Sequence, residues 1–409
     1  MTAIGRVVPA ARPRPASETL WLGYSAAPSY DYMPALDGLR AVSVVLVVLS
    51  HFGLRRYVPG GFGVTAFFFI SGFLITRQVL AEQSVKGQLD LGQFYIRRLL
   101  RLYPALLVML ACAATIGIAL GARITGGQVA AGIFYYTNIN TLFVPYLSAP
   151  EGMYHPLGVL WSLAVEEHYY LVYPALIFLV GRTRMRLALV LCLVIVAVTL
   201  WRQHLADACV FAIPPCRGDN EDSRILQGTD TRLDSILYGA VLATVLGTRL
   251  AGPVLRVLKS RLVFLAGIAM LLASFLVRDP VFRDGMRFTV QGIGLTCTIG
   301  SALFSPHLGW IRTALSVRPA LLIGRWSYSL YLWHSFVMLA VAVTLPDWVW
   351  RPALQDGAIS FGWTGIGMPL VLAGSIAVAA TSYKFVEMPM VAIRRRFGSH
   401  AVRDSIPTP

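Results

Sequence analysis

The sequence predicts an all-α integral membrane protein with about ten transmembrane helices. Of its 409 residues, 56% are hydrophobic and only 13% are charged, which is too apolar for a soluble protein of ordinary composition. Runs of about 20 mostly apolar residues recur along nearly the whole chain, and each is long enough to cross about 30 Å of hydrocarbon as a helix. Little sequence therefore remains for a large soluble domain.

The predicted spans follow one another from the first apolar run to the last. One further run, 129–149, is interrupted by Asn138, Asn140 and Pro145, so it is predicted to be a re-entrant or interfacial segment rather than a crossing. The predicted spans are residues 33–53, 61–80, 102–121, 157–180, 187–203, 233–248, 262–278, 287–306, 322–345 and 363–386.

The basic residues predict the orientation. The net charge is +15, and with both termini in the cytoplasm most of the 35 Lys and Arg fall in cytoplasmic segments, as the positive-inside rule expects. Nucleic acid is excluded as a partner, because its binding would require basic residues interleaved with aromatic ones on a soluble face. We therefore expect a multi-pass protein of the bacterial plasma (inner) membrane, embedded in the lipid bilayer. Both a monomer and an oligomer are compatible with the sequence.

Two polar tails flank the predicted transmembrane domain, 33–390. Residues 1–32 are rich in Pro, Ala and Arg and contain no apolar core of signal-peptide length, which predicts a disordered cytoplasmic arm. Residues 391–409 are predicted to be a basic cytoplasmic tail.

The cysteines do not form a metal-binding pattern. Cys209 and Cys216 lie in the longest polar connector, 203–232, which is predicted to lie outside the cell. The sequence is compatible either with a disulfide between them or with two free thiols. Cys112, Cys192 and Cys297 lie in predicted spans and are expected to be packing residues. No His and Cys spacing typical of a metal site occurs, and no metal is expected.

The first predicted span carries two polar residues, Arg40 and His51. They are eleven positions apart, which in a regular helix leaves them about 20° from the same face with a rise of about 16 Å. An intramembrane cation aligned with a deeper imidazole is arranged as if for an extended ligand. The alternative is an arginine that snorkels and a histidine bonded to a neighbouring carbonyl.

A second polar group heads the fourth predicted span, in "WSLAVEEHYYLVYP", residues 161–174. A carboxylate inside a bundle needs a partner, and we expect Glu166 to hold the ring of His51. Such a contact would fix the tautomer of the imidazole and raise the basicity of its other nitrogen. The alternative, that the glutamates mark the aqueous end of the helix, is the interpretation preferred for Glu167.

Arginines in "FYIRRLLRLYPAL", residues 94–106, lie where the third predicted span enters the membrane. Arg98 and Arg101 are three residues apart and therefore lie on neighbouring turns. Such a cluster serves as a positive-inside anchor, but its forked geometry also binds phosphates. Coenzyme A, with phosphates at one end and a thioester at the other, matches cytosolic arginines and a deeper histidine.

These motifs together resemble the acyltransferase 3 family of multi-span membrane acyltransferases. The resemblance covers residues 33–390, and its motifs occur in the order that the family shows. They are "ALDGLRAVSVVLVVLSH" at 35–51, "GFGVTAFFFISGFLIT" at 61–76, the Arg-x-x-Arg of Arg98 and Arg101, "WSLAVEEHYYLVYP" at 161–174, "TDTRLDSILYG" at 229–239, "SYSLYLWH" at 327–334 and "YKFVEMP" at 383–389.

The resemblance implies transfer of an acyl group from cytosolic acyl-coenzyme A (acyl-CoA) to a hydroxyl. It implies His51 as catalytic base with Glu166 as partner, and Arg40, Arg98 and Arg101 as donor-binding residues. The chain departs from the family pattern where His168 replaces a glutamine, Tyr169 a phenylalanine and Met388 a basic residue. The remaining polar residues of the motifs are interpreted as pocket, substrate-binding or structural residues: Glu167, His168, Tyr169, Arg232, Asp234, Tyr331 and His334.

Direct transfer is the predicted mechanism, with an acyl-histidine relay as its variant if donor and acceptor enter from opposite faces. The chain ends shortly after its last predicted span and its arginines far outnumber its lysines, which favours a stand-alone enzyme that acylates a macrolide or another glycosylated metabolite in antibiotic biosynthesis. The alternative acceptor is a cell-surface polysaccharide. The alternative class is a transporter or flippase, but the inverted repeats and broken helix pairs of many transporters are not recognisable.

Overall fold

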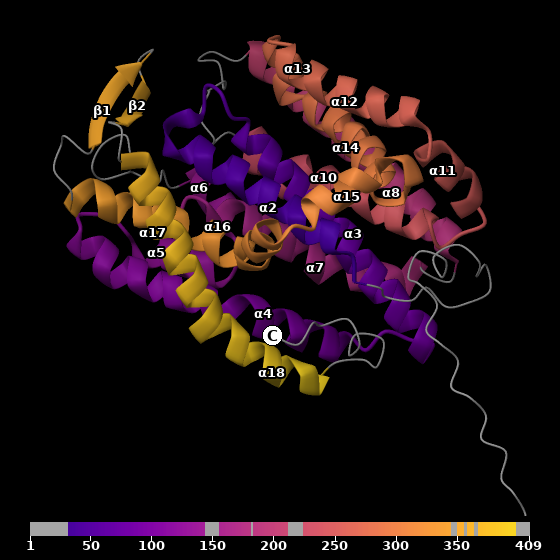
Figure 1. The fold of residues 1–409 in the computed structure, drawn as a ribbon, viewed down its shortest axis with the longest axis horizontal. Coiled ribbons are helices and arrows are strands. Elements are labelled where there is room, and N and C mark those ends of the chain that lie inside the picture. Colours follow the sequence, from indigo (N-terminus) through magenta and orange to yellow (C-terminus); the bar gives the residue numbers. More distant parts are fainter. Residues whose placement is uncertain are drawn as a thin grey trace, which may run out of the picture.

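The structure is a computed structural model that describes residues 32–143, 155–180, 183–211, 224–344, 350–355, 358–363 and 367–397. Almost all of the predicted N-terminal arm and most of the predicted C-terminal tail lie outside these residues. Cys216 also lies outside them, and with it the choice between a disulfide and free thiols at Cys209 and Cys216. The described chain is a bundle of helices, so the predicted all-α membrane fold is confirmed (Figure 1).

Seven helices of the described chain are long and apolar enough to cross a membrane, and up to nine are if each of two bent pairs counts as one span. The prediction was ten. The predicted span without a counterpart among these nine is 233–248. It corresponds to α10 (Thr229–Val245), which has only 17 residues. This helix packs between α3 (Gly60–Lys86) and α8 (Arg184–Phe211), where buried polar side chains lower its hydropathy.

The other long helices follow the predicted spans with shifted ends. The largest shift is in α4 (Leu91–Cys112), which begins eleven residues before the predicted 102 because Asp90 caps it by accepting a hydrogen bond from Gln93 N at 2.9 Å. The others are α2 (Pro34–Leu49), α7 (Leu160–Val180), α12 (Arg261–Leu276), α14 (Arg287–Phe304), α16 (Arg318–Thr344) and α17 (Gly367–Ser382), with π-turns η1 (Ser50–Leu54), η2 (Ala113–Gly117) and η4 (Tyr383–Glu387).

Short helices fill the connections. The predicted re-entrant segment forms α5 (Gly126–Ile133) and α6 (Thr137–Phe143), and neither is long enough to cross a membrane, as the sequence predicts for its described part. The remaining short helices are α9 (Arg224–Gln227), α11 (Ala251–Leu258), α13 (Pro280–Asp284), η3 (Pro306–Leu308), α15 (Gly309–Leu315), α18 (Met388–Arg394) and η5 (Arg395–Phe397).

A two-stranded hairpin in the described chain was not predicted from the sequence. β1 (Trp350–Gln355) and β2 (Ala358–Trp363) are antiparallel, with Trp350 opposite Trp363 and Gln355 opposite Ala358. The hairpin lies at one end of the bundle, and β2 packs against η1 (Figure 1).

Close contact between α3 and α10 builds the centre of the bundle. A Cβ at Gly239 would lie 1.9 Å from the carbonyl oxygen of Phe69, and one at Gly72 would lie 1.9 Å from that of Ile236. Only glycine lets the two backbones approach this closely. These contacts fix α3, which carries much of the site described below.

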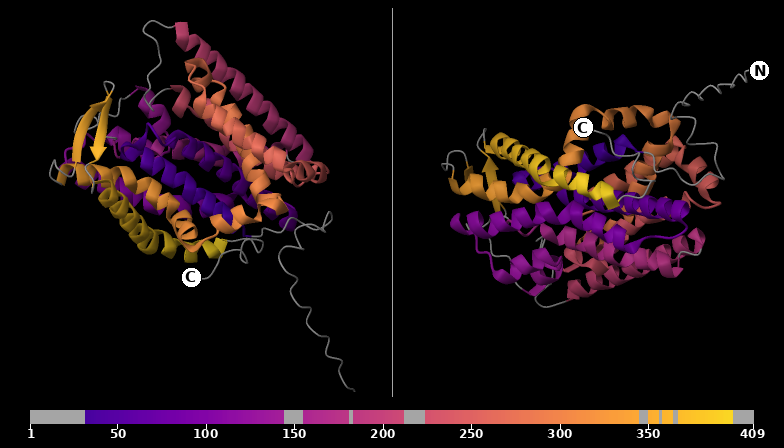
Figure 2. Two further views of the ribbon diagram at one scale, coloured as in Figure 1. Left: turned by 45° about the horizontal axis from the view of Figure 1, so that its top comes forward. Right: turned by 90° about the horizontal axis from the view of Figure 1, so that it is seen from below.

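One end of the bundle gathers cationic residues, and we call it the basic end. Arg184 of α8 donates hydrogen bonds to Ser84 of α3 and to the carbonyl of Gly247 after α10. Arg97 of α4 donates to the carbonyl of Phe397. The start of α2 lies at the same end, because Arg77 of α3 contacts Met33, the residue before α2. His51 therefore lies at the far end of α2 from the basic end, toward the hairpin. Figure 2 shows these helices from two further sides.

Candidate functional site

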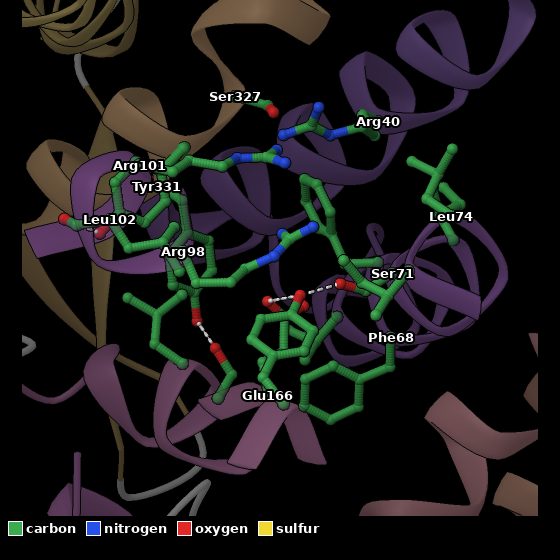
Figure 3. Close-up of a pocket in the computed structure, with 18 residues that line it drawn as sticks. Arg40, Phe68, Ser71, Leu74, Arg98, Arg101, Leu102, Glu166, Ser327 and Tyr331 are labelled. Carbon is green, nitrogen blue, oxygen red and sulfur yellow. Dashed lines mark hydrogen bonds between the residues drawn. The ribbon is translucent and has the colours of Figure 1, made fainter. Parts of the chain in front are cut away.

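A cavity of about 80 Å³ opens among α2, α3, α4, α7 and α16 (Figure 3). One water occupies about 10–15 Å³ on this measure, so the cavity accommodates several waters or a narrow chain. Its apolar wall includes Phe67, Phe68, Ile70, Leu74, Ile75 and Leu163, and its polar residues are Arg40, Ser71, Arg98, Arg101, Ser162, Glu166, Tyr170, Ser327, Tyr328 and Tyr331.

Three of the polar lining residues are arginines, and Figure 3 shows Arg40, Arg98 and Arg101 reaching into the cavity from α2 and α4. Arg98 is buried, donates to Gln78 Oε1 at 2.8 Å and lies over the ring of Tyr170 at 5.1 Å. Glu166 is the only carboxylate of the lining. Three guanidinium groups facing one carboxylate favour an anionic ligand.

The carboxylate of Glu166 is held within its own helix. Tyr170, four residues later on α7, donates its hydroxyl hydrogen to Glu166 Oε2 at 3.2 Å. Ser71 of α3 is hydrogen-bonded to the same tyrosine oxygen, and because the tyrosine proton is already used, the serine is the donor. The chain Ser71, Tyr170, Glu166 therefore crosses one side of the cavity.

His51 lies against a second histidine at the end of α2. Its Nδ1 is 2.7 Å from Nε2 of His334 on α16, and both side chains are buried. The ring planes differ by 3° and the ring centroids are 5.0 Å apart, so the rings lie edge to edge in one plane, as an in-plane nitrogen–nitrogen hydrogen bond requires. The pair ties η1 to α16.

Tyr331 connects the histidine pair to the cavity. Its hydroxyl donates to the carbonyl of Val159 at 2.9 Å and accepts from Ser162 Oγ at 2.6 Å, and both Ser162 and Tyr331 line the cavity. Its backbone carbonyl lies 2.7 Å from Nδ1 of His334. The arginines that line the cavity and the histidine pair therefore belong to one continuous arrangement.

The expected pairing of His51 with Glu166 is corrected to His51 with His334. Glu166 lines the cavity beside the arginines, whereas His51 is not among the lining residues. The periodicity argument assumed a regular helix from Arg40 to His51. Instead, α2 ends at Leu49 and a π-turn follows, with Gly53 at φ 92°, so the rotation per residue changes before His51 is reached.

Other predicted residues lie outside the lining of the cavity. His168 Nδ1 is 2.7 Å from Thr229 Oγ1, so His168 contacts the start of α10. Tyr169 stacks on Tyr173, and one carboxylate oxygen of Glu167 is buried without a hydrogen-bond partner.

Arg232 and Asp234 are fully buried and cross-link helices. Arg232 donates to Thr65 Oγ1 at 2.9 Å, which joins α10 to α3. Asp234 accepts from Arg202 of α8 at 2.8 Å. Arg202 also donates to the carbonyl of Gly285. These contacts correspond to the structural interpretation of the two residues.

Several lining residues were missed in the sequence. Tyr170 carried a signal, because it follows Glu166 by four residues and so shares its helix face. Arg202, which lies outside the lining and was also missed, carried a signal as the lone cation in the predicted span 187–203. Ser71, Ser162 and Ser327 carried none, since small hydroxyl residues are common in membrane helices. No group of three His, Cys, Asp or Glu side chains in the described ranges is arranged to bind a metal.

Comparison with known proteins gives consistent matches. A family described as an acyltransferase domain matches residues 33–380. The peptidoglycan O-acetyltransferase OatA of Listeria monocytogenes is 30% identical over 88% of this chain and 56% of its own length. A putative O-acetyltransferase of Staphylococcus aureus strain MSSA476 is 31% identical over 90% of this chain and 58% of its own. The O-acetyltransferase OatA of Staphylococcus aureus strain NCTC 8325 is 32% identical over 76% and 51%. The chain thus spans about half the length of these relatives.

Proposed function

Because the chain belongs to the acyltransferase 3 family, whose domain covers residues 33–380, we propose that it transfers an acyl group from acyl-CoA to a hydroxyl of a cell-surface polysaccharide. The observation that carries the proposal is the cavity, in which three arginines from two helices lie above an apolar wall. Arginines suit the phosphates of the donor, and the apolar wall suits its narrow arm and acyl group.

The donor enters from the basic end. Under the positive-inside rule this end faces the cytoplasm, where acyl-CoA is found, and the protein spans the bacterial inner membrane. Arg40, Arg98 and Arg101 hold the phosphates and the thioester points along α2 toward His51. Arg40 lies on α2 and His51 follows eleven residues later in η1, and a separation of this kind suits an extended arm rather than a compact ligand.

His51 acts as the general base. The acceptor oxygen attacks the carbonyl carbon of the thioester as an unprotonated nitrogen of His51 takes the hydroxyl proton, the carbon–sulfur bond breaks, and the proton passes to the departing thiolate. We propose direct transfer although the donor and the polysaccharide enter from opposite ends, because the extended donor brings its thioester to His51, where the acceptor meets it; an acyl-histidine relay is the variant. Glu166 is not needed as the partner of the base. It balances the charge of the arginines and, through Tyr170 and Ser71, shapes the wall of the cavity.

A polysaccharide is the better supported acceptor. The relatives above are O-acetyltransferases, and one of them is named for peptidoglycan. They favour the second of the two acceptors predicted from the sequence over the macrolide. The position of His51 also favours a cell-surface acceptor. His51 lies at the end of α2 away from the basic end, near the hairpin that packs on η1.

The test uses the purified protein with acetyl-, propionyl- and longer acyl-CoA. Calorimetry measures donor binding, and a thiol reagent measures release of coenzyme A with and without peptidoglycan oligosaccharides or a macrolide. We expect the donor to bind, slow thiol release without acceptor, and faster release with the oligosaccharides. Failure of every donor to bind would favour the transporter or flippase, and stimulation by the macrolide alone would reverse the choice of acceptor.

Two histidine variants complete this test. His51→Ala is expected to stop thiol release while donor binding persists, because the base is lost and the arginines remain. The matched control is His307→Ala, since His307 is exposed in η3 and should leave both quantities unchanged. Thiol release that survives in His51→Ala would refute the proposed base.

A further inference from the structure

The contact between His51 and His334 determines which nitrogen of each ring carries its proton. Nδ1 of His334 lies 2.7 Å from the carbonyl oxygen of Tyr331 and 3.3 Å from that of Leu330. A carbonyl oxygen can only accept a hydrogen bond. Nδ1 of His334 is therefore the protonated nitrogen, and Nε2 of the neutral ring is an acceptor.

The assignment passes from one ring to the next. Nε2 of His334 faces His51 Nδ1 at 2.7 Å and Ser335 Oγ at 3.3 Å. Since this nitrogen accepts, His51 Nδ1 carries a proton and donates it to the bond. In neutral His51 the unprotonated nitrogen is then Nε2, at the opposite side of the ring from His334.

We propose that His334 is the positioning residue of this site, which holds His51 as the tautomer whose Nε2 is the base. The inference rests on the proposed function, in which His51 takes the hydroxyl proton of the acceptor. His334 thereby does for His51 what a carboxylate does for the base of other acyl-transfer enzymes: it fixes the ring and its tautomer.

The pair also prepares the site for the charge that the reaction creates. When Nε2 of His51 takes the hydroxyl proton, an imidazolium forms that keeps its Nδ1 proton and uses it to donate a hydrogen bond to Nε2 of His334. The Nδ1–H of His334 in turn donates to the carbonyls of Tyr331 and Leu330. The hydrogen bonds of the pair stay as they are while the acceptor oxygen bonds to the carbonyl carbon and the carbon–sulfur bond breaks, and the proton on Nε2 of His51 passes to the departing thiolate. His334 is fully buried and on a long helix, so this acceptor stays in place through the reaction.

Two substitutions separate positioning from mere packing. In His334→Gln the side-chain oxygen reaches the place of Nε2 and still accepts from His51, while the bond to the Tyr331 carbonyl is lost. In His334→Asn the amide reaches only the place of Nδ1, so the bond to Tyr331 is kept and the one to His51 is lost. The control is Ser335→Ala, which removes the other neighbour of Nε2.

The expected result is a split between the two variants. His334→Asn lowers kcat about 100-fold or more with the Kd for acetyl-CoA unchanged, His334→Gln stays within about tenfold of the wild type, and Ser335→Ala is unaffected. Equal losses in the Asn and Gln variants, accompanied by weaker donor binding, would overturn the proposal and leave a packing role.

A measurement on the wild type does not depend on how the variants fold. Nitrogen NMR of protein labelled at its histidines reports which ring nitrogen is protonated, and the His51 signals are assigned by their loss in His51→Gln. We expect Nδ1 protonated and Nε2 unprotonated, and the reverse tautomer would overturn the inference. Failure of the proposed function is distinct: it would appear as thiol release that persists in His51→Ala, whatever the tautomer.

Discussion

Arg97 and Arg98 are adjacent on α4, yet their guanidinium groups have different partners. Arg97 donates to Glu82 Oε2 at 2.6 Å and to the carbonyl of Phe397 at 2.9 Å, which joins the ends of α3 and α4 to the last described residues of the chain. Arg98 turns the other way, lies over the ring of Tyr170 and lines the cavity. Neighbouring helical positions differ by about 100° in direction, so one helix supplies both an arginine that joins structural elements and an arginine that lines the cavity.

Arg97→Met and Arg98→Met should therefore change different properties, the first the stability of the fold and the second the affinity for the donor. Loss of Arg97 leaves Glu82 buried without its closest partner and should destabilise the fold by about 3–5 kcal/mol, with donor affinity in the surviving protein unchanged. Loss of Arg98 should weaken acetyl-CoA binding about 10- to 100-fold with little change in melting temperature. Differential scanning fluorimetry and calorimetry measure the two quantities. Equal behaviour of the variants would contradict the division of roles.

Asp234→Asn tests whether Asp234 is structural. Asp234 and Arg202 are both fully buried and 2.8 Å apart, so the amide would leave a buried cation without its counter-charge. We expect a loss of about 3 kcal/mol or more in unfolding free energy and no change in KM for the acceptor. Asp207→Asn on the exposed face of α8 is the control, and it should change stability by less than about 0.5 kcal/mol. A raised KM in stable Asp234→Asn protein would instead favour an acceptor-binding role.

Gly239→Ala should destabilise the contact of α3 with α10. The added methyl group would meet the carbonyl of Phe69 at 1.9 Å, so the helices must separate, at a cost of about 1–3 kcal/mol. Gly61→Ala is the matched control on α3, because no atom of another described segment lies within 4 Å of its added Cβ. Melting temperatures of both variants check this. If the two substitutions have the same effect, the close approach of the helices is not what selects glycine.

His155 should make stability depend on pH. It is 4% exposed in the turn before α7, its Nδ1 accepts from Leu157 N, and burial lowers the pKa of its ring to about 4. In the unfolded chain the pKa is about 6.5. As the pH falls below 6.5, the unfolded state gains a proton that the folded state does not, so stability decreases until about pH 4, by up to about 3 kcal/mol.

Melting temperatures of the wild type and of His155→Gln between about pH 7.5 and pH 4.5 test this dependence. The wild type should lose more stability toward low pH, and the difference between the two proteins should narrow as the pH decreases. Parallel curves would show that His155 does not titrate between the folded and unfolded states.

Much of the site was accessible from local sequence. Arg40, Arg98 and Arg101 were predicted to share a ligand, and all three line one cavity. Helix geometry and the rarity of charge within apolar runs singled them out, and the resemblance to the acyltransferase 3 family implied their role as donor-binding residues. The partner of His51 could not be predicted, because Glu166 and His334 are both polar residues on buried faces of their helices, and the spacing within one helix does not order residues on different helices.

The sequence by itself determined that this chain is a bundle of membrane helices, where most of them lie and which residues carry charge into their interior. It could do so because a helix in hydrocarbon satisfies its own backbone hydrogen bonds and needs only length and apolar composition. Only the tertiary structure decided that His51 meets His334, 283 residues away, and that Glu166 faces the arginines. That choice depends on the rotation of packed helices and on a five-residue π-turn, which contacts between distant segments set and no local pattern encodes.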